Sequence, residues 1–299
     1  MAHRPTLKQL NYLCAVAKHR HFGHAAKHCH VSQPTLSAGI SELEDNLGVL
    51  LVERDNKSVL LTDIGQEVVA RAQRILTQVD DLVSLVESAG KPFSGSLHLG
   101  VIPTIAPFLL PKFLPRFRRK YPDCQLFIRE DLSVNLIKRL REGELDVVLL
   151  ALPYPTEGLD FAPLYNDEFL LAYYEEHRLA NKTPLLSSDL RGQDVLLLED
   201  GHCLRDHVLE ACHLNDRDMT APFQATSLNT LVQMVANNIG VTLLPRMALD
   251  GKLLAGTHVK TRAFEEETVQ RSIGLCWRRN SPRKEEFHLL GKVITQHQS

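Results

Sequence analysis

The sequence lacks any long apolar run. Its apolar stretches, such as residues 147–152, are much shorter than the roughly 20 residues that a membrane-spanning helix needs. The opening residues, Met1-Ala2-His3-Arg4-Pro5, also lack the apolar segment of an export signal. We therefore expect a cytoplasmic protein with no membrane partner, whose 299 residues are enough for two or three domains.

Cysteine is scarce and irregularly spaced. The six cysteines, at positions 14, 29, 124, 203, 212 and 276, do not form the spacing of a disulfide framework. In a reducing compartment this pattern favours free thiols, with sensing or catalytic exceptions. We expect Cys14 and Cys29 to fill a small helical core, and Cys124 and Cys276 to pack within strands.

The sequence has no phosphate-binding loop, zinc-protease motif or serine nucleophile elbow, so we expect neither an enzyme nor a cofactor. Acidic residues are also absent before Glu42, whereas five Lys or Arg residues and six histidines precede it. The N-terminal part is therefore electropositive. Such a surface suits a polyanion, here double-stranded DNA.

The first 50 residues have the spacing of a helix-turn-helix. Apolar residues predict a helix over 7–17 and a second, short helix over 22–29. Ser32 can cap a third helix, with Pro34 in its first turn. The buried stripe of this third helix is expected at Leu36, Ile40, Leu43 and Leu47. This arrangement is typical of DNA-binding domains.

Small polar side chains near the start of the third helix suit contacts with base edges and phosphates. The residues predicted to face DNA there are Ser32, Gln33, Pro34, Thr35 and Ser37. Residues 49–54 and 59–62 are expected to form the two strands of a wing, from which Arg54 and Lys57 reach the DNA. A winged helix that contacts only proteins is the alternative.

A single long helix is predicted from Asp63 to Glu87, because apolar residues recur with no Gly or Pro after Gly65. Its apolar face is too extended for a free linker, so we expect it to pair with a second copy. The segment 90–95 breaks the helix. These features predict an all-α winged helix-turn-helix domain over 1–62, a dimerisation helix over 63–90 and a regulatory domain over 91–299.

Strands and helices alternate beyond the boundary. The pattern predicts strands over 96–102, 125–130 and 145–150, with helices over 105–120 and 135–142, in an open parallel α/β sheet. A second lobe is expected over about 165–267, and the first over about 91–164 and 268–299. Two α/β lobes of this kind, as in periplasmic binding proteins, enclose a cleft for a small molecule.

Cys203 and Cys212 stand nine positions apart in a stretch made mostly of helix formers. Nine helical steps separate two Cα atoms by roughly 13 Å, whereas a disulfide tolerates about 7 Å at most. If these thiols ever pair, the segment between them must refold, and oxidation then changes the conformation. The alternative is that both are inert, small apolar residues.

The N-terminal residues resemble LysR-type transcriptional regulators. The match comprises Phe22, Ala25, Ala26, the run Val31 to Ser37, Ile40, Leu43-Glu44, Leu47-Gly48, Val52-Glu53-Arg54, Leu61-Thr62 and Gly65. The long helix and the two-lobed domain follow in the family's order. The chain further resembles the peroxide-sensing members of this family in the runs Gly100 to Thr104, Glu199 to Asp206 with Cys212, Ala225 to Leu228 and Thr242 to Pro245.

This resemblance implies a homotetrameric activator of oxidative-stress genes that acts with RNA polymerase on promoter DNA of the bacterial nucleoid. It implies that hydrogen peroxide oxidises Cys203 to a sulfenic acid, that Cys212 resolves it to a disulfide, and that a thiol reductant resets the switch. Thr104 and Ser133 are expected to hold the peroxide, with His202 and Arg205 near the thiol.

Attack on peroxide requires a Cys203 thiolate, so the pKa of this residue must lie well below about 8.5. A helix that begins near Cys203 favours the anion through its first amide dipoles. The flanking His202 and Arg205 favour it too, whereas Asp200 and Asp206 oppose it.

A Thr104 hydroxyl is chemically suited to stabilise the departing hydroxide. Thr104 and Ser133 can equally cap the helices that follow them. Ser133 stands where the family usually has Thr, a departure that can slow peroxide capture. Ala38-Gly39 offer the bases little to contact and Asp55 puts an acid in the wing, so the preferred operator can differ.

Two other functions compete with peroxide sensing. A LysR-type regulator that binds an organic metabolite in its cleft would leave the thiols incidental. A thiol peroxidase would use the same cysteine chemistry but would not need a helix-turn-helix. The histidines at 19, 21, 24, 28 and 30, with Cys29, suggest a metal site, but a solvated face beside DNA phosphates explains them more simply, so we expect no metal.

Overall fold

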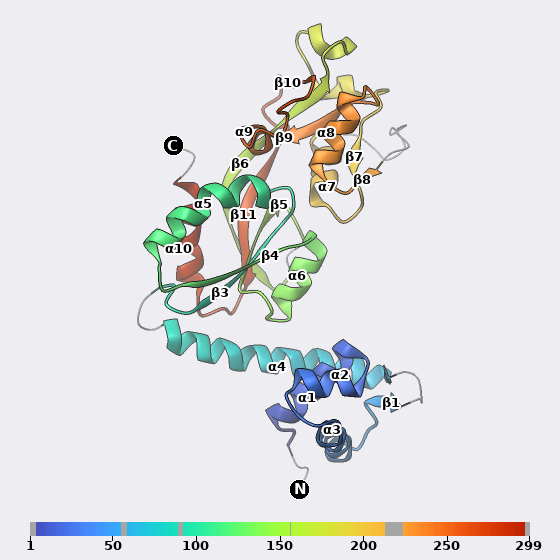
Figure 1. Ribbon diagram of the computed structural model, residues 1–299, viewed down its shortest axis with the longest axis vertical. Helices are drawn as coiled ribbons and strands as arrows, with labels where there is room; N and C mark the ends of the chain where they lie inside the picture. The colour runs from blue at the N-terminus through green and yellow to red at the C-terminus, as the bar shows by residue number, and fades with distance from the viewer. Residues whose placement is uncertain (1–3, 55–58, 89–91, 156, 213–223, 297–299) are drawn as a thin grey trace. The chain divides into compact units, whose positions relative to one another are not determined.

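The computed structural model describes residues 4–54, 59–88, 92–155, 157–212 and 224–296. The chain forms two compact units, residues 1–86 and 87–299 (Figure 1). Each unit has its own hydrophobic core, and the second unit has two.

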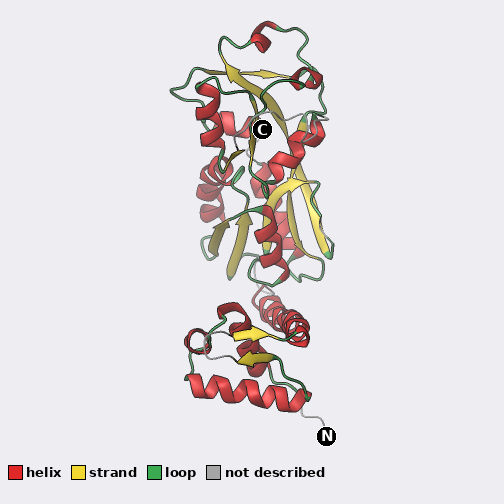
Figure 2. Ribbon diagram, turned by 90° about the vertical axis from the view of Figure 1, so that its right-hand side faces the viewer, coloured by secondary structure: helices red, strands yellow, loops and turns green. Residues whose placement is uncertain are grey.

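The first unit contains a helix-turn-helix and a wing. The elements of this part of the chain are α1 (Leu7–His19), α2 (Phe22–His28), α3 (Gln33–Leu47), β1 (Val52–Arg54), β2 (Val59–Leu61) and α4 (Asp63–Ser88). Ser32 caps α3, and its Oγ accepts a hydrogen bond from Thr35 N at 3.3 Å. The strands β1 and β2 pair antiparallel and form the wing (Figure 2). The predicted helices, wing and long helix are confirmed.

The buried face of α3 differs from the prediction at its end. Leu36, Ile40 and Leu43 are buried, but Leu47 is 38% exposed. Glu44 is buried instead, and its Oε1 accepts hydrogen bonds from the backbone N–H groups of residues 51 and 52 at 2.8 and 3.0 Å. The chain turns away at Gly48, with φ 70°, so the last turn of α3 holds the start of the wing through a carboxylate rather than through Leu47.

Gly65 lies in the first turn of α4, where a side chain has no room. A Cβ there would lie 2.1 Å from the carbonyl oxygen of Leu51, which accepts a hydrogen bond from Thr62 N at 3.1 Å. We expect Gly65→Ala to lower the free energy of unfolding of the full-length chain by about 3 kcal/mol or more, because the wing must shift to relieve the contact. Urea unfolding measures this change. Gln66→Ala, at the exposed neighbouring position, is the matched control, and an equal stability of both variants contradicts the prediction.

The first lobe of the second unit is built on a mixed sheet. Its elements are β3 (Ser96–Val101), α5 (Ala106–Lys120), β4 (Gln125–Glu130), α6 (Ser133–Arg141), β5 (Val147–Leu152), β11 (Gln270–Arg278), α10 (Lys284–Thr295) and part of β6 (Leu159–Tyr174). In Figure 1, α5 and α10 lie on one side of this sheet and α6 on the other. The core includes Leu99, Leu149 and Leu275.

The expected parallel sheet is correct only for β3, β4 and β5. Strand β3 pairs in parallel with both neighbours, but β11 runs antiparallel to β5 and to β6. The cause is the path of the chain, which returns from the second lobe through β11 and meets the outgoing strand β6 in the opposite direction. Strand β6 serves both lobes, because its first part pairs with β11 and its last part with β9 (Thr242–Pro245) and β10 (Val259–Ala263).

The second lobe surrounds a separate core that includes Phe169, Leu197 and Leu243. Its remaining elements are η1 (Arg178–Asn181), η2 (Ser187–Leu190), β7 (Leu197–Leu198), α7 (Cys203–Ala211), β8 (Gln224–Ala225), α8 (Leu228–Ala236) and α9 (Arg246–Asp250). The two-lobed α/β fold expected from the sequence is therefore confirmed, although strand β10 and helix α9 were not expected.

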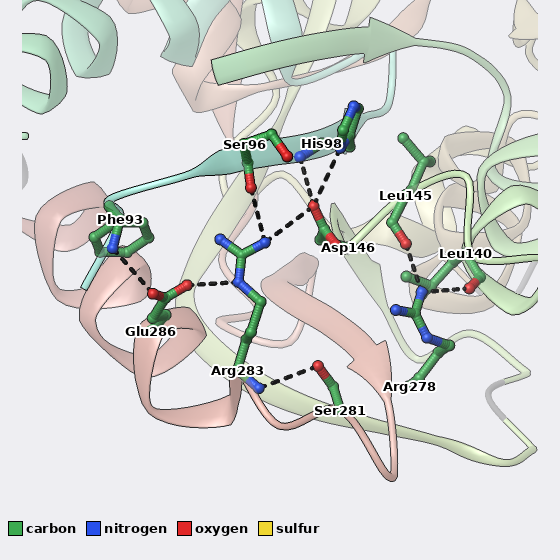
Figure 3. Close-up of polar contacts among 10 residues, drawn as sticks. All are labelled: Phe93, Ser96, His98, Leu140, Leu145, Asp146, Arg278, Ser281, Arg283 and Glu286. Atoms are coloured by element: carbon green, nitrogen blue, oxygen red, sulfur yellow. Dashed lines mark hydrogen bonds and ion pairs between the residues drawn. The ribbon is translucent and has the colours of Figure 1, made fainter. Parts of the chain in front are cut away.

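A buried polar network at Arg283 joins the beginning and the end of the first lobe (Figure 3). The Arg283 guanidinium donates to Glu286 Oε2 at 2.7 Å and to Ser96 O at 2.9 Å. It also lies 3.3 Å from Asp146 Oδ2. Glu286 Oε1 in turn accepts from Phe93 N at 2.9 Å. The network thus fixes the first buried residue of the lobe, Phe93, to the last helix.

Candidate functional site

The first candidate site lies at the start of α7. Gly201 has a φ of 97°, a conformation that L side chains rarely adopt, and it turns the chain after β7. His202 is the N-cap residue and Cys203 is the first residue of the helix. The amide dipoles of the first turn therefore favour negative charge on Cys203, whose side chain is buried.

The pKa of Cys203 lies below its ordinary value. Burial is the largest single influence and raises the pKa, but the effects of its neighbours together outweigh it. These are hydrogen bonding by His207 and Ser133 and the positive charges of His207 and Arg271. The surroundings of Cys203 therefore favour a thiolate, the form that attacks peroxide.

His207 lies one helical turn after Cys203, so both side chains occupy the same face of α7. Its Nε2 is 2.9 Å from the carbonyl oxygen of Pro153. Its Nδ1 and the Ser133 hydroxyl are buried and make no hydrogen bond of ordinary geometry within the described residues. Burial acts to lower the pKa of His207, but the hydrogen bond and charge of Cys203 raise it overall. His207 was not predicted from the sequence, although its spacing from Cys203 was a visible signal.

Arg271, from β11, supplies the second positive charge and was also missed. Its side chain is fully buried and its Nε and Nη2 donate to Asp167 Oδ2 at 3.1 and 3.0 Å. Its Nη1 donates to Thr104 Oγ1 at 2.9 Å, and Nη2 to Thr104 O at 3.1 Å. Because Thr104 Oγ1 accepts this bond, its own hydroxyl hydrogen is available to a ligand.

The surroundings of Cys212 favour the neutral thiol, in contrast to those of Cys203. It is buried at the C-cap of α7, and burial, followed by the charge of Glu266, raises its pKa to about 12. Cys203 packs in the core of the first lobe, whereas Cys212 packs in that of the second. The length of α7 separates their Cα atoms by roughly 13 Å, so a bond between them requires α7 to unfold.

The remaining predicted residues have different surroundings from those expected. Arg205 Nε lies 3.1 Å from Asp200 Oδ1, and the cations that lower the pKa of Cys203 are His207 and Arg271 instead. Burial lowers the pKa of His202, although the charge of Glu199 opposes this, so His202 favours its neutral form. His202 is therefore a poor source of positive charge for the thiol.

Neither Thr104 nor Ser133 acts as a helix cap through its side chain. The N-cap residues of α5 and α6 are Ile105 and Leu132, and neither helix has a side-chain cap. Both residues are instead buried, at 3% and 1% exposure. Thr104 Oγ1 accepts from Arg271, and Ser133 acts to lower the pKa of Cys203. The capping alternative is wrong for both.

A cavity of about 440 Å³ lies between the two lobes, next to the thiol site. Thr104, Asp131 and Leu132 line it from the first lobe, and Glu199, His202 and Thr226 are among those that line it from the second. Leu132 and His202 directly precede Ser133 and Cys203 in the chain. The cavity therefore adjoins the thiol site, although neither Ser133 nor Cys203 lines it.

The pKa differences predict which thiol peroxide modifies. Burial raises the pKa of Cys124 to about 11 and that of Cys276 to about 12, so both are thiols at neutral pH. In a Cys212→Ser variant at pH 7, we expect one equivalent of peroxide to form a sulfenic acid at Cys203 alone. The rate falls as the pH is lowered through the pKa of Cys203, because protonation removes the nucleophile. Trapping with a dicarbonyl reagent, followed by peptide mass spectrometry, measures the site of the sulfenic acid and the rate at which it forms. Earlier modification of Cys124 or Cys276 contradicts the prediction.

The second candidate site is the DNA-binding surface. Of the residues predicted to face DNA, Ser32, Gln33, Pro34 and Thr35 are exposed at the start of α3, and Ser37 is half-buried on the next turn. Arg54 ends β1. Lys57 and Asp55 lie outside the described residues.

The histidine-rich face does not form a metal site within the part of the chain that the structure describes. His21 instead caps α2, because its Nδ1 accepts from the N–H groups of Gly23 and His24 at 3.0 and 3.3 Å. The rings of His19 and His28 pack at 4.9 Å between centroids. The histidines thus include structural members of the helix-turn-helix.

Gln33 is the exposed side chain on α3 with the reach to read an adenine edge. We expect Gln33→Ala to weaken binding to a specific operator about 5–100-fold and to affect nonspecific DNA little, because base contacts specify and phosphate contacts position. Fluorescence anisotropy at fixed salt measures both. Gln66→Ala, an exposed amide on α4, is the control, and an unchanged operator affinity for Gln33→Ala contradicts the prediction.

Comparisons with known families identify the class of protein. Residues 7–66 match the family of bacterial regulatory helix-turn-helix proteins of the lysR type. Residues 90–299 match the LysR substrate binding domain. The chain therefore belongs to the LysR family of transcriptional regulators, a family of DNA-binding proteins and not of enzymes. The thiol peroxidase alternative is thus not supported. Within the described residues, no helix has both the length and the apolar character to span a bilayer.

Within this family the chain closely resembles OxyR. It is 41% identical to the DNA-binding transcriptional dual regulator OxyR of Escherichia coli K12 over 288 residues, 96% of this chain and 94% of that protein. It is also 40% identical over 295 residues to the HTH-type transcriptional regulator EstR of Acinetobacter baylyi, covering 98% and 97% of the two chains.

Solved structures extend this similarity to the fold. A variant of full-length OxyR from Pseudomonas aeruginosa superposes with a TM-score of 0.78 at 36% identity, covering 98% of this chain and 95% of the other. An OxyR mutant from Corynebacterium glutamicum, solved with H2O2 bound, gives 0.68 at 35% identity, covering 99% and 93%.

Proposed function

We propose that this LysR-family regulator senses hydrogen peroxide through Cys203 and responds by forming a Cys203–Cys212 disulfide. The observation that carries the proposal is the contrast between the two thiols. Cys203 has a lowered pKa beside two cations, whereas Cys212 has a raised pKa in another core. One cysteine is thus prepared to attack peroxide, and the other reacts only after the helix moves.

The chemistry proceeds in two steps. The Cys203 thiolate attacks one peroxide oxygen, and an S–O bond forms as the O–O bond breaks, which gives a sulfenic acid. The hydroxyls of Thr104 and Ser133 hold the peroxide and stabilise the departing oxygen. The Cys212 thiol then attacks the sulfenic sulfur and displaces water, and a thiol reductant later restores both thiols.

The proposal assigns DNA contacts to residues 1–62, dimerisation to 63–90 and sensing to 91–299. Exposed apolar side chains on α4, among them Ile75, Leu82 and Val83, support a pairing of two copies. We assign a homotetramer that contacts promoter DNA and RNA polymerase and activates oxidative-stress genes. The bound H2O2 in the Corynebacterium glutamicum relative supports peroxide as the signal.

A metabolite sensor is the second candidate. The inter-lobe cavity of about 440 Å³ is far larger than one peroxide molecule requires. The similarity to EstR is also nearly equal to the similarity to OxyR. This alternative leaves Cys203 without a role, so the reaction of Cys203 with peroxide distinguishes the two candidate functions.

The test is a thiol count by mass spectrometry after one equivalent of peroxide per subunit, with peptide mapping of any new bond. We expect a Cys203–Cys212 disulfide within seconds, together with an altered operator footprint. Cys203→Ser abolishes both changes, and Cys124→Ser, a matched thiol with a raised pKa, abolishes neither. If both thiols remain reduced in the wild-type protein, peroxide sensing is rejected and a metabolite screen of the cleft follows.

A further inference from the structure

We propose that His207 is the acid–base partner of Cys203: it takes the thiol proton in the resting site and delivers it to the leaving oxygen of peroxide. The inference rests on the proposed peroxide reaction and adds a residue to it. It rests on two features of the structure, the spacing of Cys203 and His207 on α7 and the contact between His207 and Pro153.

The contact with Pro153 fixes which nitrogen of His207 is available. A carbonyl oxygen only accepts hydrogen bonds, so Nε2, at 2.9 Å from Pro153 O, carries a hydrogen. The other nitrogen, Nδ1, is buried and makes no hydrogen bond of ordinary geometry within the described residues. It is thus the nitrogen left to exchange a proton with Cys203. This is the arrangement of an activated nucleophile, in which a third group orients the base.

The groups packed around His207 leave few other sources for that proton. Helix α7 packs against β11 and β7. Strand β11 contributes Arg271, which stays charged and lowers the pKa of His207, and β7 consists of two leucines. Tyr154 also lies near the thiol. Burial, followed by the charges of Cys203 and Asp206, raises its pKa above its ordinary value, so Tyr154 keeps its proton at neutral pH. His207 is the group at this site that both accepts and releases a proton near neutral pH.

The step balances without an external acid. In the resting site the proton of Cys203 resides on His207 Nδ1, which gives a thiolate and an imidazolium. The thiolate electron pair forms the S–O bond, and the O–O pair moves to the distal oxygen. That oxygen takes the proton from Nδ1 and leaves as water, and His207 becomes neutral. The net reaction converts a thiol and hydrogen peroxide into a sulfenic acid and water.

The experiment compares His207→Gln with the wild-type chain, both carrying Cys212→Ser so that the reaction stops at the sulfenic acid. The Gln amide retains a donor for Pro153 O but does not titrate. We expect about a 100-fold slower oxidation of Cys203 at pH 7 and a pH midpoint displaced upward, because general acid–base catalysis contributes this much or more. Glu210→Gln, an exposed change on the same helix, leaves rate and midpoint unchanged.

The outcomes separate the two proposals. If Cys203 does not react with peroxide in the protein that retains His207, the proposed function fails. If that protein reacts and His207→Gln matches it in rate and pH midpoint, the role of His207 is overturned. A slower His207→Gln with an unchanged midpoint also overturns it, because that result indicates a purely structural role. Should His207→Gln fail to fold by circular dichroism, His207→Asn replaces it under the same criteria.

Discussion

The buried ion pair between Arg271 and Asp167 determines the geometry of the thiol site. One carboxylate oxygen of Asp167 binds the guanidinium, and the other accepts the N–H of Met247 at 3.0 Å. Arg271 in turn holds both the hydroxyl and the carbonyl of Thr104. Strands β6 and β11, the loop before α5 and the start of α9 therefore meet at one charge pair. Loss of one partner leaves an uncompensated buried charge, which costs several kcal/mol.

Helix α7 is held by two cores, so the Cys203–Cys212 bond proposed above would change the packing of both. Cys203 packs in the first lobe, while Leu204, Val208 and Cys212 pack in the second. Removing a Leu or Val side chain from a core costs about 1.5–3 kcal/mol, and a short-loop disulfide stabilises by about 2–4 kcal/mol. The two quantities are similar. In the proposed mechanism, the packing that α7 loses and the disulfide that it gains are therefore both worth a few kcal/mol, so reduction of the disulfide restores the packed helix.

Local signals in the sequence predicted the local structure well. The Ser32 cap and the apolar periodicity placed the helix-turn-helix, because such features act over one or two turns. Strand direction was not predicted where it depends on distant pairing, as in β6, whose two parts pair in different lobes. The sequence singled out Cys203 and Cys212 as candidates through their setting, but it did not single out Arg271, because Arg271 reaches the site from a strand far along the chain. His207 was missed because helical spacing alone does not reveal that a residue is buried.

The charge balance of the site indicates what drives the conformational change. In the resting form, with the acid–base role assigned to His207, the Cys203 thiolate and the His207 imidazolium form one pair, and Arg271 and Asp167 form another. Oxidation removes both members of the first pair, since the proton leaves with water and the sulfenic acid is neutral. The second pair is untouched, so no unpaired charge remains buried and repulsion does not open the site. In the proposed mechanism, the driving force for unfolding α7 is therefore the formation of the disulfide itself, which ties the response to the second thiol rather than to oxidation of the first.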